Sequence, residues 1–186
     1  MNEEKILELN EVYEQLVKDG IKKGCGICKY LYHGTSKYIA YQILDKDEIK
    51  AGDEVGYLGI GFYCYYFDIE ASKIWARGRN TGKIAVLNLV ANLGNTFFIS
   101  KELHRSFEDL AAEYSDFSSD INITVGFIIE RVIKEFIKPK YDIDVHTVGQ
   151  CHIYRKSKKR KSRSGLMYSL RNKLMVKKIE LCWEEQ

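Results

Sequence analysis

The sequence has few of the features that divide a chain into parts or send it to a membrane. Its 186 residues include a single proline, Pro139, and no linker rich in serine, glycine and proline. We therefore expect one domain over residues 1–186. No apolar run approaches the roughly 20 residues that span a bilayer. The first residues are acidic and amphipathic, so we expect no signal peptide.

Cysteine is sparse, and its placement argues against a disulfide framework. The sequence has five cysteines and no expected secretion signal, which favours reduced thiols and a cytoplasmic protein. Cys25 and Cys28 have the C-x-x-C spacing of metal and redox sites. A zinc site needs two further ligands, and the sequence has no second C-x-x-C pair to supply them. We expect two ordinary thiols and no metal.

The common nucleotide-binding and catalytic motifs are also missing. The glycine-rich stretch GYLGIG (56–61) lacks the Lys-Ser/Thr ending of a P-loop. It does not run straight into a helix, as a Rossmann loop does. No local signature of a serine or cysteine triad is present. With 45% hydrophobic and 30% charged residues, the chain is nevertheless too apolar to be disordered.

The charge is unevenly distributed. The net charge is only +3, but residues 155–163 read RKSKKRKSR, with seven basic residues and no acidic one. The rest of the chain has 22 basic and 26 acidic residues, a net charge of −4. Such a cluster can hold phosphates, which makes nucleic acid a candidate partner. The alternative is a solvated loop. The predicted nucleic-acid-binding residues are Arg155, Lys156, Lys158, Lys159, Arg160, Lys161 and Arg163.

Hydrophobic periodicity predicts an α+β fold. Apolar residues at helical spacing indicate helices over 3–19, 36–44, 69–78, 101–114 and 120–137. Ser36 and Asp68 are the expected N-caps of the second and third helices. Apolar or alternating runs indicate strands over 29–33, 62–67, 83–91, 95–100, 141–148, 150–154, 165–171 and 176–183.

Two motifs about thirty residues apart carry groups suited to a flat polar ligand. LYHGTS (31–36) is a strand that ends in a histidine, followed by a glycine turn and a helix. GIGFYCYYFDIEASKIWA (59–76) is a glycine turn, an aromatic strand and a helix. Tyr63 and Trp75 offer two aromatic faces, and Ser72, three residues before Trp75, offers a hydroxyl. Taken singly, the histidine and both aromatics also fit purely structural roles.

Together, the two motifs resemble the ADP-ribosyltransferases of the H-Y-E type, which include diphtheria toxin and the poly(ADP-ribose) polymerases. The resemblance implies a split, mostly antiparallel sheet with NAD as co-substrate in its cleft. It further implies that the histidine holds the adenosine-side ribose, the glycine backbone binds the carboxamide, and the tyrosine stacks on the nicotinamide. The serine and the second aromatic complete the pocket. The positions are His33 and Tyr63 (catalytic), with His33, Gly34, Thr35, Tyr63, Ser72 and Trp75 binding the cofactor.

The third motif of this family is a glutamate near the start of a late strand, and here Met167 stands at that position. A thioether cannot stabilise the oxocarbenium-like centre that forms as nicotinamide leaves. Three interpretations stay open. Another polar residue serves, such as Gln150, Arg171 or Glu180; or the chain is a variant whose acid comes from elsewhere; or it binds NAD without turning it over.

The sequence thus predicts a mono-ADP-ribosyltransferase that acts as a toxin or phage-defence effector. Nucleic acid, RNA above all, is the favoured acceptor because the basic cluster directly precedes the third-motif strand. Tyr154 and Tyr168 flank that cluster and could stack on bases. A protein acceptor, an inactive NAD-binding or nucleic-acid-binding module and an RNA 2′-phosphotransferase are the alternatives. The first helix could dock an antitoxin protein.

Overall fold

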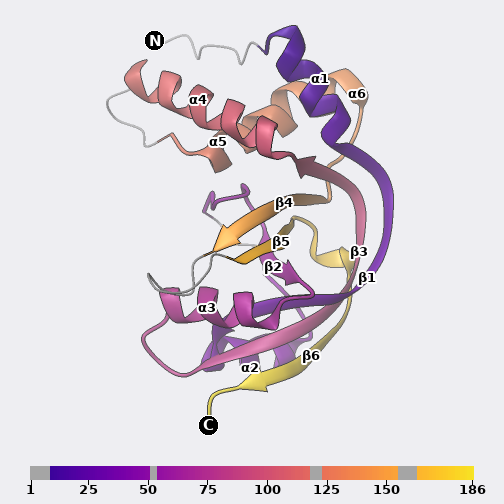
Figure 1. Cartoon of the computed structure of the whole chain (residues 1–186). Coiled ribbons are helices and arrows are strands. Elements are labelled where there is room, and N and C mark those ends of the chain that lie inside the picture. Colours follow the sequence, from indigo (N-terminus) through magenta and orange to yellow (C-terminus); the bar gives the residue numbers. More distant parts are fainter. Residues whose placement is uncertain (1–8, 51–53, 118–122, 155–162) are drawn as a thin grey trace, which may run out of the picture.

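The structure is a computed structural model that describes residues 9–50, 54–117, 123–154 and 163–186. Helices and one six-stranded sheet make it an α+β fold (Figure 1), as predicted. Figure 1 shows α1, α4, α5 and α6 gathered at one end of the molecule and α2 and α3 at the other. The helices are α1 (Glu11–Gly20), α2 (Lys37–Lys46), α3 (Ile69–Arg79), α4 (Lys101–Phe117), α5 (Val125–Arg131) and α6 (Lys138–Tyr141), with a π-helical segment, Val132–Ile137, between the last two.

The described strands form one continuous sheet in the order β1-β2-β5-β4-β3-β6, and β3 also pairs with β1. Five of them therefore close on themselves, and β6 lies outside against β3. Every pairing is antiparallel except β3 with β4, so the sheet is mostly antiparallel as expected. The expected split into two parts is not found. The strands are β1 (Ile21–Ser36), β2 (Phe62–Tyr66), β3 (Ile84–Ile99), β4 (Thr147–Tyr154), β5 (Arg163–Leu170) and β6 (Val176–Glu184).

One long strand replaces two predicted ones. β3 (Ile84–Ile99) covers nearly all of the predicted strands 83–91 and 95–100 without a break, and Gly94, with a positive φ of 57°, lies within it. This strand pairs with β6 through Ala91 and then with β4 from Thr96. The prediction of a strand over 141–148 was wrong for residues 141–146, since strand structure begins at Thr147.

The helix predictions hold apart from their ends. Ser36 accepts a hydrogen bond from the Ile39 amide, and Asp68 accepts one from the Ala71 amide, so both expected N-caps are confirmed. The first helix begins at Glu11, with Asn10 as its cap; residues 3–8 of the predicted helix lie outside the described residues. Within the described ranges, no helix is long and apolar enough to cross a membrane.

The closed part of the sheet separates two apolar clusters. One cluster lies under α1, α4 and α5 and includes Phe97, Phe107 and Met167. The other lies beside α2 and includes Leu31 and Phe62. Successive residues of β2 alternate between the two clusters, because neighbouring side chains of a strand point to opposite faces. This alternation places Tyr63 and Phe62 on opposite sides of the same strand.

Candidate functional site

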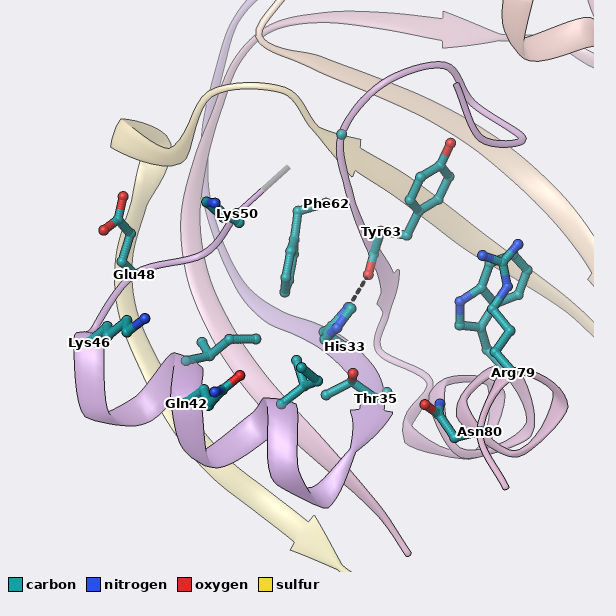
Figure 2. A pocket seen from close by; sticks show the side chains of 15 residues that line it. His33, Thr35, Gln42, Lys46, Glu48, Lys50, Phe62, Tyr63, Arg79 and Asn80 are labelled. Atoms are coloured by element: carbon teal, nitrogen blue, oxygen red, sulfur yellow. Dashed lines mark hydrogen bonds between the residues drawn. The ribbon is translucent and has the colours of Figure 1, made fainter. Parts of the chain in front are cut away.

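A cavity opens where β1 and β2 separate. The two strands pair only at Leu31 with Tyr66 and at Tyr32 with Tyr65. β1 then continues to Ser36 paired with β3 alone. The resulting cavity has a volume of about 530 Å³, a size typical of small-molecule sites. Its lining is His33, Gly34, Thr35, Ile39, Gln42, Ile43, Lys46, Glu48, Lys50, Gly61, Phe62, Tyr63, Trp75, Arg79 and Asn80 (Figure 2).

His33 lies in the middle of this cavity, and its tautomer is fixed by the backbone. Its Nδ1 lies 2.7 Å from the carbonyl oxygen of Tyr63. A carbonyl can only accept, so Nδ1 carries the proton and Nε2 keeps its lone pair. Figure 2 shows this bond bridging the gap between the two strands. The imidazole also lies against the Phe62 ring, with 3.9 Å between centroids.

Burial lowers the pKa of His33 to about 4, and the hydrogen bond to the Tyr63 carbonyl offsets only part of that effect. His33 is therefore neutral near pH 7. Its Nε2 is a hydrogen-bond acceptor on the cavity wall, which suits a ligand hydroxyl.

Acid should destabilise the fold through His33. The unfolded chain binds this proton near pH 6.5 and the folded chain only near pH 4, so the contribution of neutral His33 is complete above about pH 6.5. It is lost as the pH falls towards 4. Urea unfolding at several pH values should show a slope in this window that His33→Asn reduces. An unchanged slope in the variant would show that His33 does not titrate in this way.

Tyr63 and Trp75 present nearly parallel rings at one end of the cavity. Their centroids are 6.2 Å apart and their planes differ by 20°. Two van der Waals contacts, each about 3.5 Å, are needed to hold a flat ring between them, roughly 7 Å in all. The two centroids are closer than this, so a flat ring could enter only if Trp75 moved outward. The Arg79 guanidinium lies 4.2 Å from the centroid of the Trp75 ring.

The Tyr63 ring is held by its hydroxyl. The Tyr63 hydroxyl donates to the Gly59 carbonyl at 2.6 Å and accepts from the Leu58 amide at 2.8 Å. Burial raises the pKa of Tyr63 to about 12, so it stays protonated. The turn over residues 56–61 therefore fixes the orientation of the ring in the cavity wall.

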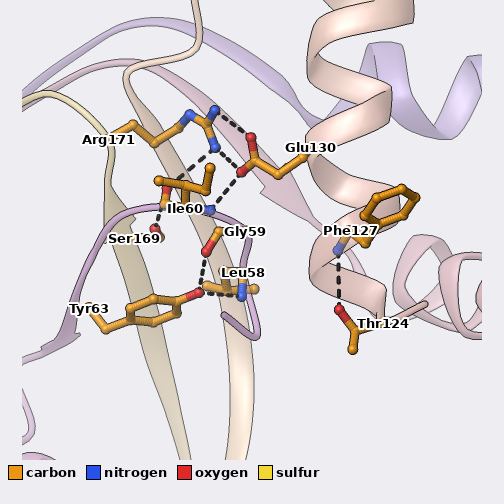
Figure 3. A network of polar contacts seen from close by, with 9 residues as sticks. All are labelled: Leu58, Gly59, Ile60, Tyr63, Thr124, Phe127, Glu130, Ser169 and Arg171. Carbon is orange, nitrogen blue, oxygen red and sulfur yellow. Dashed lines mark hydrogen bonds and ion pairs between the residues drawn. The ribbon is translucent and has the colours of Figure 1, made fainter. Parts of the chain in front are cut away.

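The same turn is anchored by an ion pair between α5 and the end of β5 (Figure 3). The Glu130 carboxylate accepts a hydrogen bond from the Ile60 amide at 2.7 Å. It also accepts hydrogen bonds from both terminal nitrogens of Arg171. Both charged side chains are only 19% exposed. Gly59, with φ of 78°, faces this carboxylate, and a Cβ there would overlap it. Glu130 thus holds the turn that holds Tyr63.

Gly34 is required by packing between β1 and α3. A Cβ at Gly34 would overlap the Ser72 carbonyl of the helix. Gly34→Ala should therefore push α3 and Trp75 away from β1, at a cost of about 1–3 kcal/mol in the free energy of unfolding. Gly78→Ala is the matched control, since nothing lies within 4 Å of its Cβ position. That helical change should stabilise by about 0.5–1 kcal/mol. Equal effects in chemical unfolding would contradict this role for Gly34.

The structure brings five of the six predicted cofactor-binding residues to the cavity, Ser72 being the exception. His33, Gly34, Thr35, Tyr63 and Trp75 all line it. Ser72 is fully buried and does not line it. Its hydroxyl donates to the Tyr32 carbonyl at 2.8 Å, which ties α3 to β1.

Among the described residues that line the cavity, no carboxylate takes the place of Met167 at the Tyr63 end. Met167 is completely buried in the apolar core, between Tyr65 of β2 and Gln150 of β4. Gln150 is also buried, and its Oε1 has no hydrogen-bond partner among the described residues. Arg171 forms an ion pair with Glu130. Glu180 lies on the outer strand β6, paired with Lys178. None of these three lines the cavity.

The predicted basic cluster cannot be placed. Residues 155–162 lie outside the described residues, and of Arg163 only the backbone is described. The side chain of Tyr154 is likewise outside them. Tyr168 packs against the second apolar cluster, and burial raises its pKa to about 12. The prediction that Tyr168 is an exposed stacking residue was wrong.

The two C-x-x-C cysteines lie on β1, half-buried and unbonded to each other. Burial raises the pKa of Cys28. Across the described ranges, no three His, Cys, Asp or Glu side chains gather as a metal site would require.

Sequence reasoning missed several cavity and support residues. Lys46, Lys50 and Arg79 make the lining positive against one carboxylate, Glu48, which itself pairs with Lys173. Glu130 follows two buried isoleucines on α5. A charged residue next to buried ones was the signal in the sequence that could have indicated its role. Lys46 and Lys50 belong to no motif, so the sequence offered no signal for them.

Comparison with known proteins does not identify the chain. No protein-family model, curated protein or solved structure matches it.

Proposed function

We propose that the chain binds NAD in the cavity between β1 and β2 and transfers its ADP-ribosyl group to an acceptor, with release of nicotinamide. The carrying observation is that both motifs that resemble the H-Y-E family meet at one cavity, through the bond between His33 and Tyr63. The separation of β1 from β2 supplies an opening in the sheet at that point.

The two ends of the cavity suit the two kinds of group in NAD. The rings of Tyr63 and Trp75 would hold the flat nicotinamide. The neutral His33 Nε2 would accept a hydrogen bond from a ribose hydroxyl. Lys46, Lys50 and Arg79 would balance the two negative charges of the diphosphate.

In the reaction, the bond between the ribose carbon and the nicotinamide nitrogen breaks, and nicotinamide leaves with the electron pair. A nucleophilic oxygen or nitrogen of the acceptor then bonds to that carbon and gives up its proton to solvent. Tyr63 and Trp75 would place the leaving group. The positive charge that develops on the ribose needs a stabilising group. Met167, at the position expected for the glutamate, cannot provide it, so another group would have to.

The charges of the cavity lining favour a second candidate function. Glu48 is the sole carboxylate in the lining, among described residues, and an ion pair with Lys173 neutralises it. A cavity without a free carboxylate favours a module that binds NAD and does not turn it over.

One experiment separates the two functions. The purified chain is incubated with NAD and mixed RNA, DNA and protein, and free nicotinamide and ADP-ribosylated products are measured by mass spectrometry. Transfer that Tyr63→Ala abolishes supports the transferase. A rise in melting temperature with NAD and no nicotinamide release supports the binding module. Neither effect in the wild type would contradict both.

A further inference from the structure

The end of the cavity away from Tyr63 is charged. Figure 2 shows Lys46, Glu48 and Lys50 there, at the end of α2 and just after it. His33 lies between this group and Tyr63. We call Lys46, Glu48 and Lys50 the charged end of the cavity. Among the described lining residues Glu48 is the only carboxylate, so it alone would repel a negatively charged ligand group at this end.

Glu48 is ionised, and cations surround its charge. It forms an ion pair with Lys173, in the connection between β5 and β6, and both side chains are about half exposed. The hydrogen bond from Lys173 lowers the pKa of Glu48, and the charges of Lys46 and Lys50 lower it further. The three lysines and the one carboxylate together have a net charge of +2. That charge matches the two negative charges of a dinucleotide diphosphate.

A second cavity adjoins the charged end. It has a volume of about 400 Å³ and shares Glu48 and Lys50 with the first cavity. Its other lining residues are Ile49, Leu170, Arg171, Asn172 and Lys173. A ligand that has a flat ring at Tyr63 and extends toward the second cavity passes the Glu48 carboxylate. In NAD, the group at that place would be the adenosine ribose, which lies between the diphosphate and the adenine.

We propose that Glu48 makes the cavity select NAD over NADP, which has a further phosphate on the 2′-oxygen of the adenosine ribose. A carboxylate accepts hydrogen bonds from ribose hydroxyls and repels a phosphate at the same place, as acidic residues do in other dinucleotide sites. The diphosphate already balances the charge of the group, and a 2′-phosphate adds about two negative charges beside Glu48. This inference rests on the proposed function, because it takes the nicotinamide to lie at Tyr63.

Calorimetric titration with NAD and with NADP tests the proposal. The wild type should bind NADP at least about tenfold more weakly than NAD, because a carboxylate and a doubly charged phosphate a few ångströms apart repel each other by about that factor even in water. Glu48→Gln keeps the shape of the side chain and removes its charge, so the affinity for NADP relative to NAD should rise about tenfold. Its melting temperature should stay close to the wild-type value, because the ion pair with Lys173 is half exposed.

Lys173→Met separates the effect of charge from that of structure. It breaks the same ion pair as Glu48→Gln but removes a cation instead of an anion. The affinity for NADP relative to NAD should therefore fall in Lys173→Met, whereas it rises in Glu48→Gln. A shift in the same direction in both variants would overturn the proposal, because the pair would then act only by holding the connection between β5 and β6.

Glu180→Gln is the matched control. It removes one negative charge from a similarly exposed ion pair, with Lys178 on β6, and neither residue lines either cavity. Its preference between NAD and NADP should equal that of the wild type. Equal affinity of the wild type for the two dinucleotides, or an unchanged preference in Glu48→Gln, would overturn this inference alone. A folded wild type that binds neither dinucleotide would overturn the proposed function and this inference with it.

Discussion

Replacing His33 with asparagine should reduce NAD affinity by about tenfold to a hundredfold while the fold stays close to wild-type stability. The asparagine amide nitrogen can take the place of Nδ1 and keep the bond to the Tyr63 carbonyl. No atom of asparagine reaches the position of Nε2, so the acceptor for the ribose hydroxyl is lost. Leaving a buried polar group without its hydrogen-bond partner costs about 1–3 kcal/mol, a range that includes that change in affinity. Calorimetric titration with NAD measures it.

His33→Gln is the control for this reasoning. Its amide oxygen can reach the place of Nε2, but the donor to the Tyr63 carbonyl is lost. We expect this variant to be less stable than His33→Asn and to bind NAD better. The reverse order for NAD affinity would show that His33 acts only as a link between β1 and β2.

Replacing Glu130 with alanine should lower the free energy of unfolding by about 3 kcal/mol, because it leaves the Arg171 guanidinium largely buried and unpaired. For a chain of this size, that corresponds to a fall of roughly 6–12 °C in melting temperature. The Ile60 amide loses its acceptor as well, so the turn over 56–61 should loosen. NAD affinity should fall with it, since this turn orients Tyr63. Calorimetric unfolding measures the stability change.

Two further variants isolate the cause. Glu180→Ala removes a carboxylate from an exposed pair on β6 and should change stability by no more than about 0.5–1 kcal/mol. The double variant Glu130→Leu, Arg171→Met removes both charges and should recover most of the stability lost in Glu130→Ala. If the double variant is as unstable as the single one, the unpaired arginine is not the cause.

Local patterns predicted the elements that the site depends on. The caps Ser36 and Asp68 were predictable because a side-chain oxygen there meets free amides at a helix start. The meeting of His33 and Tyr63 followed only from the resemblance of the two motifs, since no local rule pairs residues thirty apart. Spacing alone does not tell whether a hydroxyl faces a cavity or a neighbouring strand, and the Ser72 hydroxyl bonds to the Tyr32 carbonyl of β1.

The remaining features depend on long-range packing that a sequence does not display. The closure of five strands needs β3 to change partners along its length. Glu130 supports Tyr63 across seventy residues of sequence, through a turn whose shape depends on the ion pair with Arg171.

Calorimetric titration of the purified chain with NAD, beside Tyr63→Ala, tests the central claim most directly. The wild type should bind NAD at one site, free nicotinamide should compete for it, and Tyr63→Ala should lose it. NAD binding that persists unchanged in Tyr63→Ala, or no binding by the folded wild type, would contradict the assignment of the cavity between β1 and β2 to NAD.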